Sequence, residues 1–128
     1  MKKLISIILT AILATTLFAT VAFAVDARWT NVVAITPSIS ASSGEYASVI
    51  RGVSGTTKIK YSLTLYEKGS TGAYREVSST SGTYYGQQYR ATGSYSITKG
   101  KTYKLVTAAT VTCNGTNEDV SYTYEKKC

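Results

Sequence analysis

The chain lacks most of the side chains from which hydrolytic active sites are built. It contains no histidine, which removes the usual base at neutral pH, the commonest metal ligand and the Ser-His and Cys-His triads. Only Glu118 and Asp119 are adjacent acids, and they follow a turn, where solvated charge is expected. No pair can be placed across a cleft as glycoside hydrolysis requires. We therefore expect a non-enzymatic protein without a metal site or cofactor. The acidic residues are Asp26, Glu45, Glu67, Glu76, Glu118, Asp119 and Glu125.

Tyrosines gather in the segment TYYGQQYRATGSY, residues 83 to 95. Tyr84, Tyr85 and Tyr89 lie there beside two glutamines and Arg90. Such rings and polar groups can stack on sugars and hydrogen-bond their hydroxyls, and aromatic-rich edges also bind proteins. A simpler interpretation is that alternate tyrosines fill a core poor in Phe and Leu. The four residues are our candidates for a binding site, with both interpretations open.

The two cysteines, Cys113 and Cys128, bracket the closing stretch CNGTNEDVSYTYEKKC. A disulfide between them would staple a loop, but Asn-Gly predicts a hairpin turn. With a four-residue turn NGTN, Cys113 lies opposite Glu118, and Cys128 is then about 33 Å further along the strand. A disulfide needs Cα atoms within about 7 Å. We favour the hairpin, which leaves both cysteines as candidate intermolecular thiols and predicts a disulfide-linked dimer through Cys128 on a mobile basic tail.

Residues 1–24 have the pattern of a secretory signal peptide. Lys2 and Lys3 precede a long apolar run, and Ala22-Phe23-Ala24 supplies small residues at a cleavage site after Ala24. The alternative is a retained membrane anchor, since the run is long enough to span a bilayer. Cleavage would release residues 25–128 as one secreted, extracellular domain with no further segment suited to stable membrane insertion.

The chain is basic, with a formal net charge of +7, of which Lys2 and Lys3 would leave with the signal peptide. The remaining lysines and arginines are scattered along the sequence, whereas a nucleic-acid reader would cluster them. We expect no nucleic-acid partner. The charge predicts solubility and a mild attraction to anionic wall polymers or membranes.

The apolar pattern alternates with a period of two almost throughout. In TKIKYSLTLY, residues 57 to 66, Ile59, Tyr61, Leu63 and Leu65 fall on one face, which predicts a half-buried strand. Seven short strands between Gly/Ser turns predict an all-β fold, a single sandwich of about seven antiparallel strands. We expect the first strand to stop at Pro37 and the fifth to have a bulge or bend at Gly93. The expected strands cover residues 28–36, 45–51, 57–66, 74–78, 89–97, 101–112 and 119–125.

The segment ITKGKTYKLVTAA, residues 97 to 109, resembles the signature that leads into the sixth strand of fibronectin type III domains. Ile97, Gly100, Tyr103 and Leu105 hold the expected places, while Lys99 replaces a common proline and Thr107 a common valine. The resemblance implies an immunoglobulin-like, fibronectin type III-like sandwich in which Tyr103 packs at a corner and its hydroxyl satisfies a nearby backbone group. The segments RWTN and GTTKIK and the tyrosine-rich final hairpin also resemble small secreted single-domain proteins of Gram-positive gut bacteria, which implies nothing about activity.

Two functions fit these features. The first is a secreted binding or adhesion module that contacts a polysaccharide, a cell-wall polymer or an extracellular protein. The second is a secreted cationic antimicrobial or toxin-like protein that acts on membranes or walls. A strongly apolar or amphipathic inserting segment would favour the second, and residues 25–128 show none in the sequence, so we favour the first.

Overall fold

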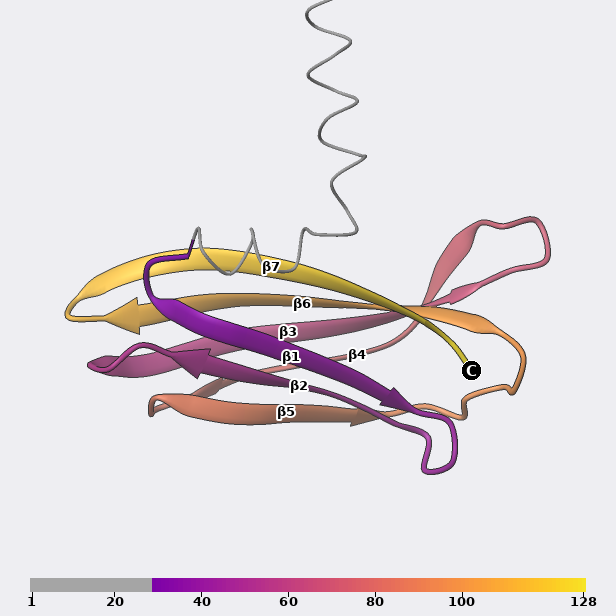
Figure 1. Ribbon diagram of the computed structural model, residues 1–128, viewed down its shortest axis with the longest axis horizontal. Coiled ribbons are helices and arrows are strands. Elements are labelled where there is room, and N and C mark those ends of the chain that lie inside the picture. Colours follow the sequence, from indigo (N-terminus) through magenta and orange to yellow (C-terminus); the bar gives the residue numbers. More distant parts are fainter. Residues whose placement is uncertain (1–28) are drawn as a thin grey trace, which may run out of the picture.

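The two central strands of the protein have side chains that alternate between the core and the outer face of the sheet. The computed structural model describes residues 29–128, which form seven strands that pair antiparallel (Figure 1). β3 and β6 lie side by side and bury Ile59, Leu63 and Leu65 from one strand against Leu105 and Val111 from the other. The strands are β1 (Val32–Ser40), β2 (Glu45–Gly52), β3 (Thr56–Lys68), β4 (Tyr74–Tyr84), β5 (Gln88–Ser94), β6 (Thr102–Cys113) and β7 (Thr116–Lys127).

The strands form two sheets that pack as a sandwich, as the sequence predicts. One sheet has the order β1-β2-β5 and the other the order β4-β3-β6-β7 (Figure 1). β4 is longer than the expected strand over residues 74–78, because it follows β3 from Lys68 back to Ile59. The strands β1, β5, β4 and β7 are the edges of the two sheets.

The core between the sheets consists of two apolar clusters. Tyr46 and Tyr103 are fully buried, which confirms that tyrosine fills part of a core poor in Phe and Leu. Between the clusters, Thr107 Oγ1 donates a hydrogen bond to Ser48 Oγ at 3.0 Å, and both side chains are inaccessible to solvent. The first cluster contains Val32, Ile35, Ile50, Ile59, Ala109, Val111 and Val120, and the second Ile39, Tyr46, Leu63, Leu65, Ala91, Tyr103 and Leu105.

Two local expectations are wrong. Pro37 does not end the first strand, since β1 continues to Ser40 with Pro37 opposite Ser48. An edge strand tolerates proline because one side of its backbone needs no partner. Gly93 makes no bulge either, since β5 pairs with β2 in an unbroken register. A glycine is required at this position because a Cβ there would lie 2.3 Å from Cζ of the buried Tyr46 ring.

The β6–β7 hairpin is confirmed, with a tighter turn than expected. Asn114 and Gly115 form a two-residue turn with φ of 52° and 78°, the left-handed conformations that a type I′ turn requires. Cys113 therefore pairs with Thr116, and the expected pairing with Glu118 is wrong. Both cysteines are free thiols, and they lie at opposite ends of the sheet.

The basic tail over residues 126–128 is docked and not mobile as expected, and both of its lysines belong to the end of β7. Lys126 Nζ donates to the carbonyl of Ile39 at 2.8 Å, and the N–H of Cys128 donates to the carbonyl of Lys101 at 2.9 Å. Cys128 packs against the second core cluster and is partly buried. These contacts hold the end of β7 against both sheets.

The expected signal peptide, residues 1–24, and its cleavage site lie outside the described residues. Within residues 29–128 there is no helix long and apolar enough to cross a membrane.

Candidate functional site

Three short connections meet at one end of the sandwich. They are the β2–β3 turn (residues 53–55), the β4–β5 loop (residues 85–87) and the β6–β7 turn (residues 114–115), at the left in Figure 1. Gly52 and Gln87 exchange two hydrogen bonds, at 2.8 and 3.3 Å, that tie the β4–β5 loop to β2. The Cys113 thiol donates to the carbonyl of Ser54 at 3.6 Å and so links the other two turns. Short, interlinked connections make this end a preorganised surface.

The tyrosines at this end form a continuous stack of three rings. Tyr84 stacks on Tyr89 with centroids 4.6 Å apart and planes inclined by 20°. Tyr89 in turn packs on Tyr61, at 5.1 Å and 33°. Tyr89 and Tyr61 are partly buried and touch both core clusters, so the inner part of this tyrosine stack is anchored in the sandwich.

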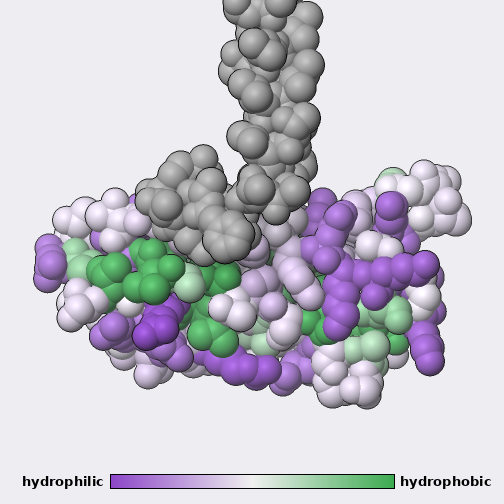
Figure 2. Space-filling model, in the orientation of Figure 1, coloured by the Kyte–Doolittle hydropathy of each residue, from purple (hydrophilic) through white to green (hydrophobic). Residues whose placement is uncertain are grey.

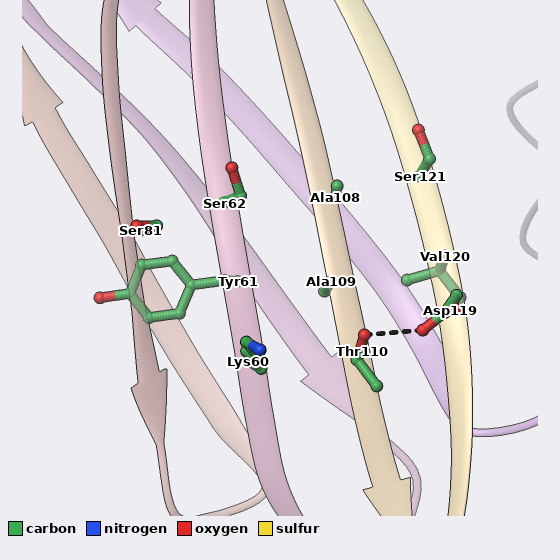
Figure 3. Close-up of a pocket in the computed structure, with 10 residues that line it drawn as sticks. All are labelled: Lys60, Tyr61, Ser62, Ser81, Ala108, Ala109, Thr110, Asp119, Val120 and Ser121. Atoms are coloured by element: carbon green, nitrogen blue, oxygen red, sulfur yellow. Dashed lines mark hydrogen bonds between the residues drawn. The ribbon is translucent and has the colours of Figure 1, made fainter.

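Two glycines make room for the stack. A Cβ at Gly82, opposite Tyr61 on β4, would lie 2.6 Å from the Tyr61 hydroxyl. A Cβ at Gly86 would lie 2.5 Å from Cε2 of Tyr84. The Tyr61 ring therefore extends from β3 toward β4, as Figure 3 shows, and the Tyr84 ring covers the loop at Gly86.

The outer end of the stack is open to solvent. Tyr84 is 38 % exposed and Tyr85, the next residue, 75 % exposed. Among the described residues the large hydrophobic side chains that are exposed are these two and Val33 on β1. Two consecutive tyrosines, one stacked on Tyr89 and one at the start of the loop, thus expose aromatic surface at this end of the sandwich.

The four candidate residues have different surroundings in the structure. Tyr84 and Tyr89 stack, and Tyr85 follows Tyr84 on the loop. Arg90 is exposed, whereas Tyr89 before it packs on the core, because neighbouring residues of a strand face opposite sides. Arg90 Nη2 lies 2.9 Å from a Glu45 carboxylate oxygen and is already paired. Of the four candidate residues, the structure brings Tyr84, Tyr85 and Tyr89 together and pairs Arg90 with Glu45.

The sequence did not reveal the part of Tyr61 in this stack. Its place on the core face of an alternating strand was correct, but its contact with Tyr89 depends on how β3, β4 and β5 pair. The sequence feature that could have indicated this contact is Gly82, which lies opposite Tyr61 and leaves room for its ring. That pairing can be recognised only when the register of β3 against β4 is known.

A shallow hollow of about 510 Å³ lies on the four-stranded sheet, beside Tyr61 (Figure 3). Small side chains make its floor, with Ser62, Ala108 and Ser121 on three neighbouring strands. Thr110 Oγ1 donates to Asp119 Oδ1 at 2.6 Å across the lower part of the hollow (Figure 3). The hollow offers hydroxyl groups and one carboxylate to a polar ligand.

Glu118, expected to be a solvated charge, instead holds the start of β1. Its carboxylate accepts the backbone N–H groups of Thr30 at 2.9 Å and Asn31 at 2.6 Å. The Asn31 side-chain amide donates to the carbonyls of Val111 and Thr116, both at 2.9 Å. Glu118 and Asp119 are consecutive residues of β7, so their side chains point to opposite faces and do not face each other as a catalytic pair would.

A second buried carboxylate, Glu67, belongs to the corner that the resemblance assigns to Tyr103. The Tyr103 hydroxyl accepts the N–H of Thr98 at 2.8 Å, which confirms the expected bond to the backbone. The same hydroxyl donates to Glu67 Oε2 at 2.8 Å. This hydrogen bond, and after it the charges of Lys101 and Arg75, hold the pKa of Glu67 below its ordinary value despite burial. An ionised carboxylate with these partners stabilises the corner at Tyr103.

Residues 29–128 contain no group of three or more acidic or cysteine side chains placed to hold a metal ion. A search against models of known protein families finds no match for the chain, and a comparison with curated protein sequences also finds none. The class that the structure defines is therefore a seven-stranded all-β sandwich with a tyrosine stack at one end.

Proposed function

We propose that this chain is a secreted, non-enzymatic binding module that contacts polysaccharide through Tyr84 and Tyr85. The observation that carries the proposal is the exposure of Tyr84, whose ring stacks on the core-anchored Tyr89, and of Tyr85 next to it in the chain. Sugar-binding surfaces use rigid aromatic faces because the ring loses little conformational freedom on binding while its face and hydroxyl both make contacts. The neighbouring Gln88 is exposed and can hydrogen-bond sugar hydroxyls.

We also propose that the sandwich is fibronectin type III-like. In the constant-type immunoglobulin arrangement the fourth strand belongs to the sheet of the first, second and fifth strands. Here β4 lies at the edge of the other sheet, beside β3. The bond from the Thr98 backbone to the Tyr103 hydroxyl, at the start of the sixth strand, supports the same class.

The position of the stack supports a binding role as well. In sandwiches of this kind the loops gathered at one end are a common place for ligand contacts, because rigid sheets hold them in fixed positions. The β2–β3, β4–β5 and β6–β7 connections meet at the end that carries Tyr84 and Tyr85.

The test is retention of the purified protein on insoluble polysaccharides and on bacterial cell walls. A double variant, Tyr84→Ala with Tyr85→Ala, should lower the affinity at least tenfold, equivalent to about 1.4 kcal/mol. Tyr89→Phe keeps the stacked ring and should retain binding. Tyr66→Ala with Tyr74→Ala removes two tyrosines at the other end of the four-stranded sheet and serves as the matched control on uncharged polysaccharides.

Three outcomes would count against the proposal. Equal loss in the Tyr84/Tyr85 and Tyr66/Tyr74 variants would mean that the site lies elsewhere. Loss of retention after protease treatment of the walls would identify a protein partner. Killing of bacteria without retention on walls or polysaccharide would favour the antimicrobial alternative.

A further inference from the structure

The fold gathers basic side chains that are scattered in the sequence. The end of β3, the start of β4, the β5–β6 loop with the start of β6, and the end of β7 all lie at the end of the sandwich opposite the tyrosine stack (Figure 1). Seven of the eleven lysines and arginines among residues 29–128 belong to these segments. This cationic end consists of Lys68, Arg75, Lys99, Lys101, Lys104, Lys126 and Lys127.

Acidic residues do not balance this charge. The same segments carry three acids, Glu67, Glu76 and Glu125. Glu67 is buried and shared between Arg75 at 3.2 Å and Lys101 at 3.5 Å. Glu45 also lies at this end, and it is paired with Arg90, so the two cancel. Four of the five net positive charges of residues 29–128 are therefore found at the cationic end.

Three of these ammonium groups form no ion pair, although Lys68 Nζ lies 5.9 Å from the centroid of the Tyr74 ring. Lys68, Lys99 and Lys127 are exposed, and none lies within 4 Å of a carboxylate of residues 29–128. Figure 2 shows strongly hydrophilic side chains gathered at this end, on the right of the view. Unpaired lysines near one another repel, and an anion that binds them relieves that repulsion.

A fourth lysine is held in place by aromatic rings. Lys104 Nζ lies 5.0 Å from the centroid of Tyr66 and 4.4 Å from that of Tyr74. Burial, and then the hydrogen bond to Glu125, raise the pKa of Tyr74 to about 12. The Tyr74 hydroxyl therefore stays neutral and adds no negative charge to the cationic end.

We infer that the cationic end binds a flexible anionic polymer that carries phosphate groups along its chain. Six of the seven cations are lysines, which act as mobile point charges and accept phosphates in varied positions, whereas arginine favours fixed bidentate geometry. An anionic lipid surface is less suitable, because peripheral membrane binding also requires inserted apolar side chains. The exposed large hydrophobic residues of the described chain, Val33, Tyr84 and Tyr85, belong to segments at the opposite end.

This site is independent of the tyrosine stack and goes beyond the polysaccharide-binding function. The two sites lie at opposite ends of one rigid sandwich, so one molecule has a surface for a neutral sugar chain and a separate surface for a polyanion. A substitution that abolishes ligand binding at one of these sites should leave binding at the other unchanged.

The test uses the purified chain and fluorescently labelled linear inorganic polyphosphate, with affinity measured over a range of salt concentrations. Binding through three lysines should give a slope of log affinity against log salt of about −2, from roughly −0.7 for each phosphate neutralised on a flexible strand. The triple variant Lys68→Gln/Lys99→Gln/Lys127→Gln should lose at least tenfold in affinity at low salt, and its slope should flatten accordingly.

The matched control removes the same charge elsewhere, as Arg51→Gln/Lys58→Gln/Lys60→Gln, and should change the affinity less than threefold. Circular dichroism and thermal unfolding verify that both triple variants are folded. Equal losses in the two variants would overturn the inference, because binding would then follow net charge alone. Tighter binding to vesicles of anionic phospholipid than to polyphosphate, at equal phosphate concentration, would overturn it in favour of a lipid surface.

Discussion

The buried, charged carboxylate of Glu67 is stabilised by the polar and cationic groups around it. Its carboxylate is 5 % exposed and is surrounded by a tyrosine hydroxyl, a lysine and an arginine. Burial of a carboxylate is costly unless it is paired and hydrogen-bonded, and here both conditions hold. Because the same tyrosine hydroxyl accepts the N–H of Thr98, the network connects the end of β3 to the β5–β6 loop.

This network predicts a pH dependence of stability. The folded pKa of Glu67 is below its ordinary value of 4.5, so its stabilisation is complete above that pH and is lost as the pH falls through the lower, folded pKa. Glu67→Gln should lower the free energy of unfolding at pH 7 by about 1–3 kcal/mol. The difference between wild type and variant should then shrink as the pH falls below about 4.5.

Denaturant unfolding at a series of pH values measures this difference. Glu76→Gln, at an exposed carboxylate on the neighbouring strand, is the control and should show a small difference. A Glu67→Gln difference that stays constant from pH 7 to pH 3 would contradict the assigned role.

At the scale of elements, β2 and β6 meet through a pair of buried hydroxyls. Ser48 and Thr107 face each other across the sandwich at the boundary between the two apolar clusters. The Thr107 hydroxyl, on one sheet, finds its partner Ser48 on the opposite sheet. Each hydroxyl is satisfied only while the other is present.

Removal of both partners should therefore lower the free energy of unfolding by less than the sum of the two single removals. Thr107→Val or Ser48→Ala alone leaves a buried hydroxyl group unpaired and should lower the free energy of unfolding by about 1–3 kcal/mol. The double variant should lose less than the sum of the two single variants, because no polar group is left unsatisfied. Denaturant unfolding of all four proteins completes the cycle, and strictly additive losses would show that the two hydroxyls are not coupled.

At the scale of the whole molecule, the sandwich has two chemically different ends. Tyrosine rings and short connections lie at one end, and unpaired lysines lie at the other. The free cysteines follow the same division, since Cys113 is buried beside Ser54 while Cys128 lies next to Lys101 at the cationic end. An intermolecular disulfide needs an accessible sulfur atom, which favours Cys128.

We predict a disulfide-linked dimer through Cys128. Under oxidising conditions a non-reducing gel should show a band at twice the monomer mass that disappears with reductant and in Cys128→Ser. Cys113→Ser should leave the dimer unchanged because that thiol is covered by the fold. A dimer that persists in Cys128→Ser, or a thiol count of zero on the folded monomer, would contradict the prediction.

Much of this fold could be predicted from local pattern. The alternation in residues 57–66 and 101–112 gave β3 and β6, and Asn114-Gly115 gave the turn that keeps Cys113 and Cys128 apart. These features are readable because strand alternation and turn conformation depend on residues near one another in the chain. They are what the sequence by itself determined: a sandwich of seven antiparallel strands with a hairpin at its end.

The contacts that define the candidate sites were decided only by the tertiary structure. Tyr61 joins the stack, Glu118 holds Thr30 and Asn31, and distant lysines meet at one end because of the register in which separate strands pair. The turn of two residues in place of four moved every partner along β7, which the local pattern left open. Register is fixed by the packing of whole faces against each other, so it depends on residues that are far apart in the sequence.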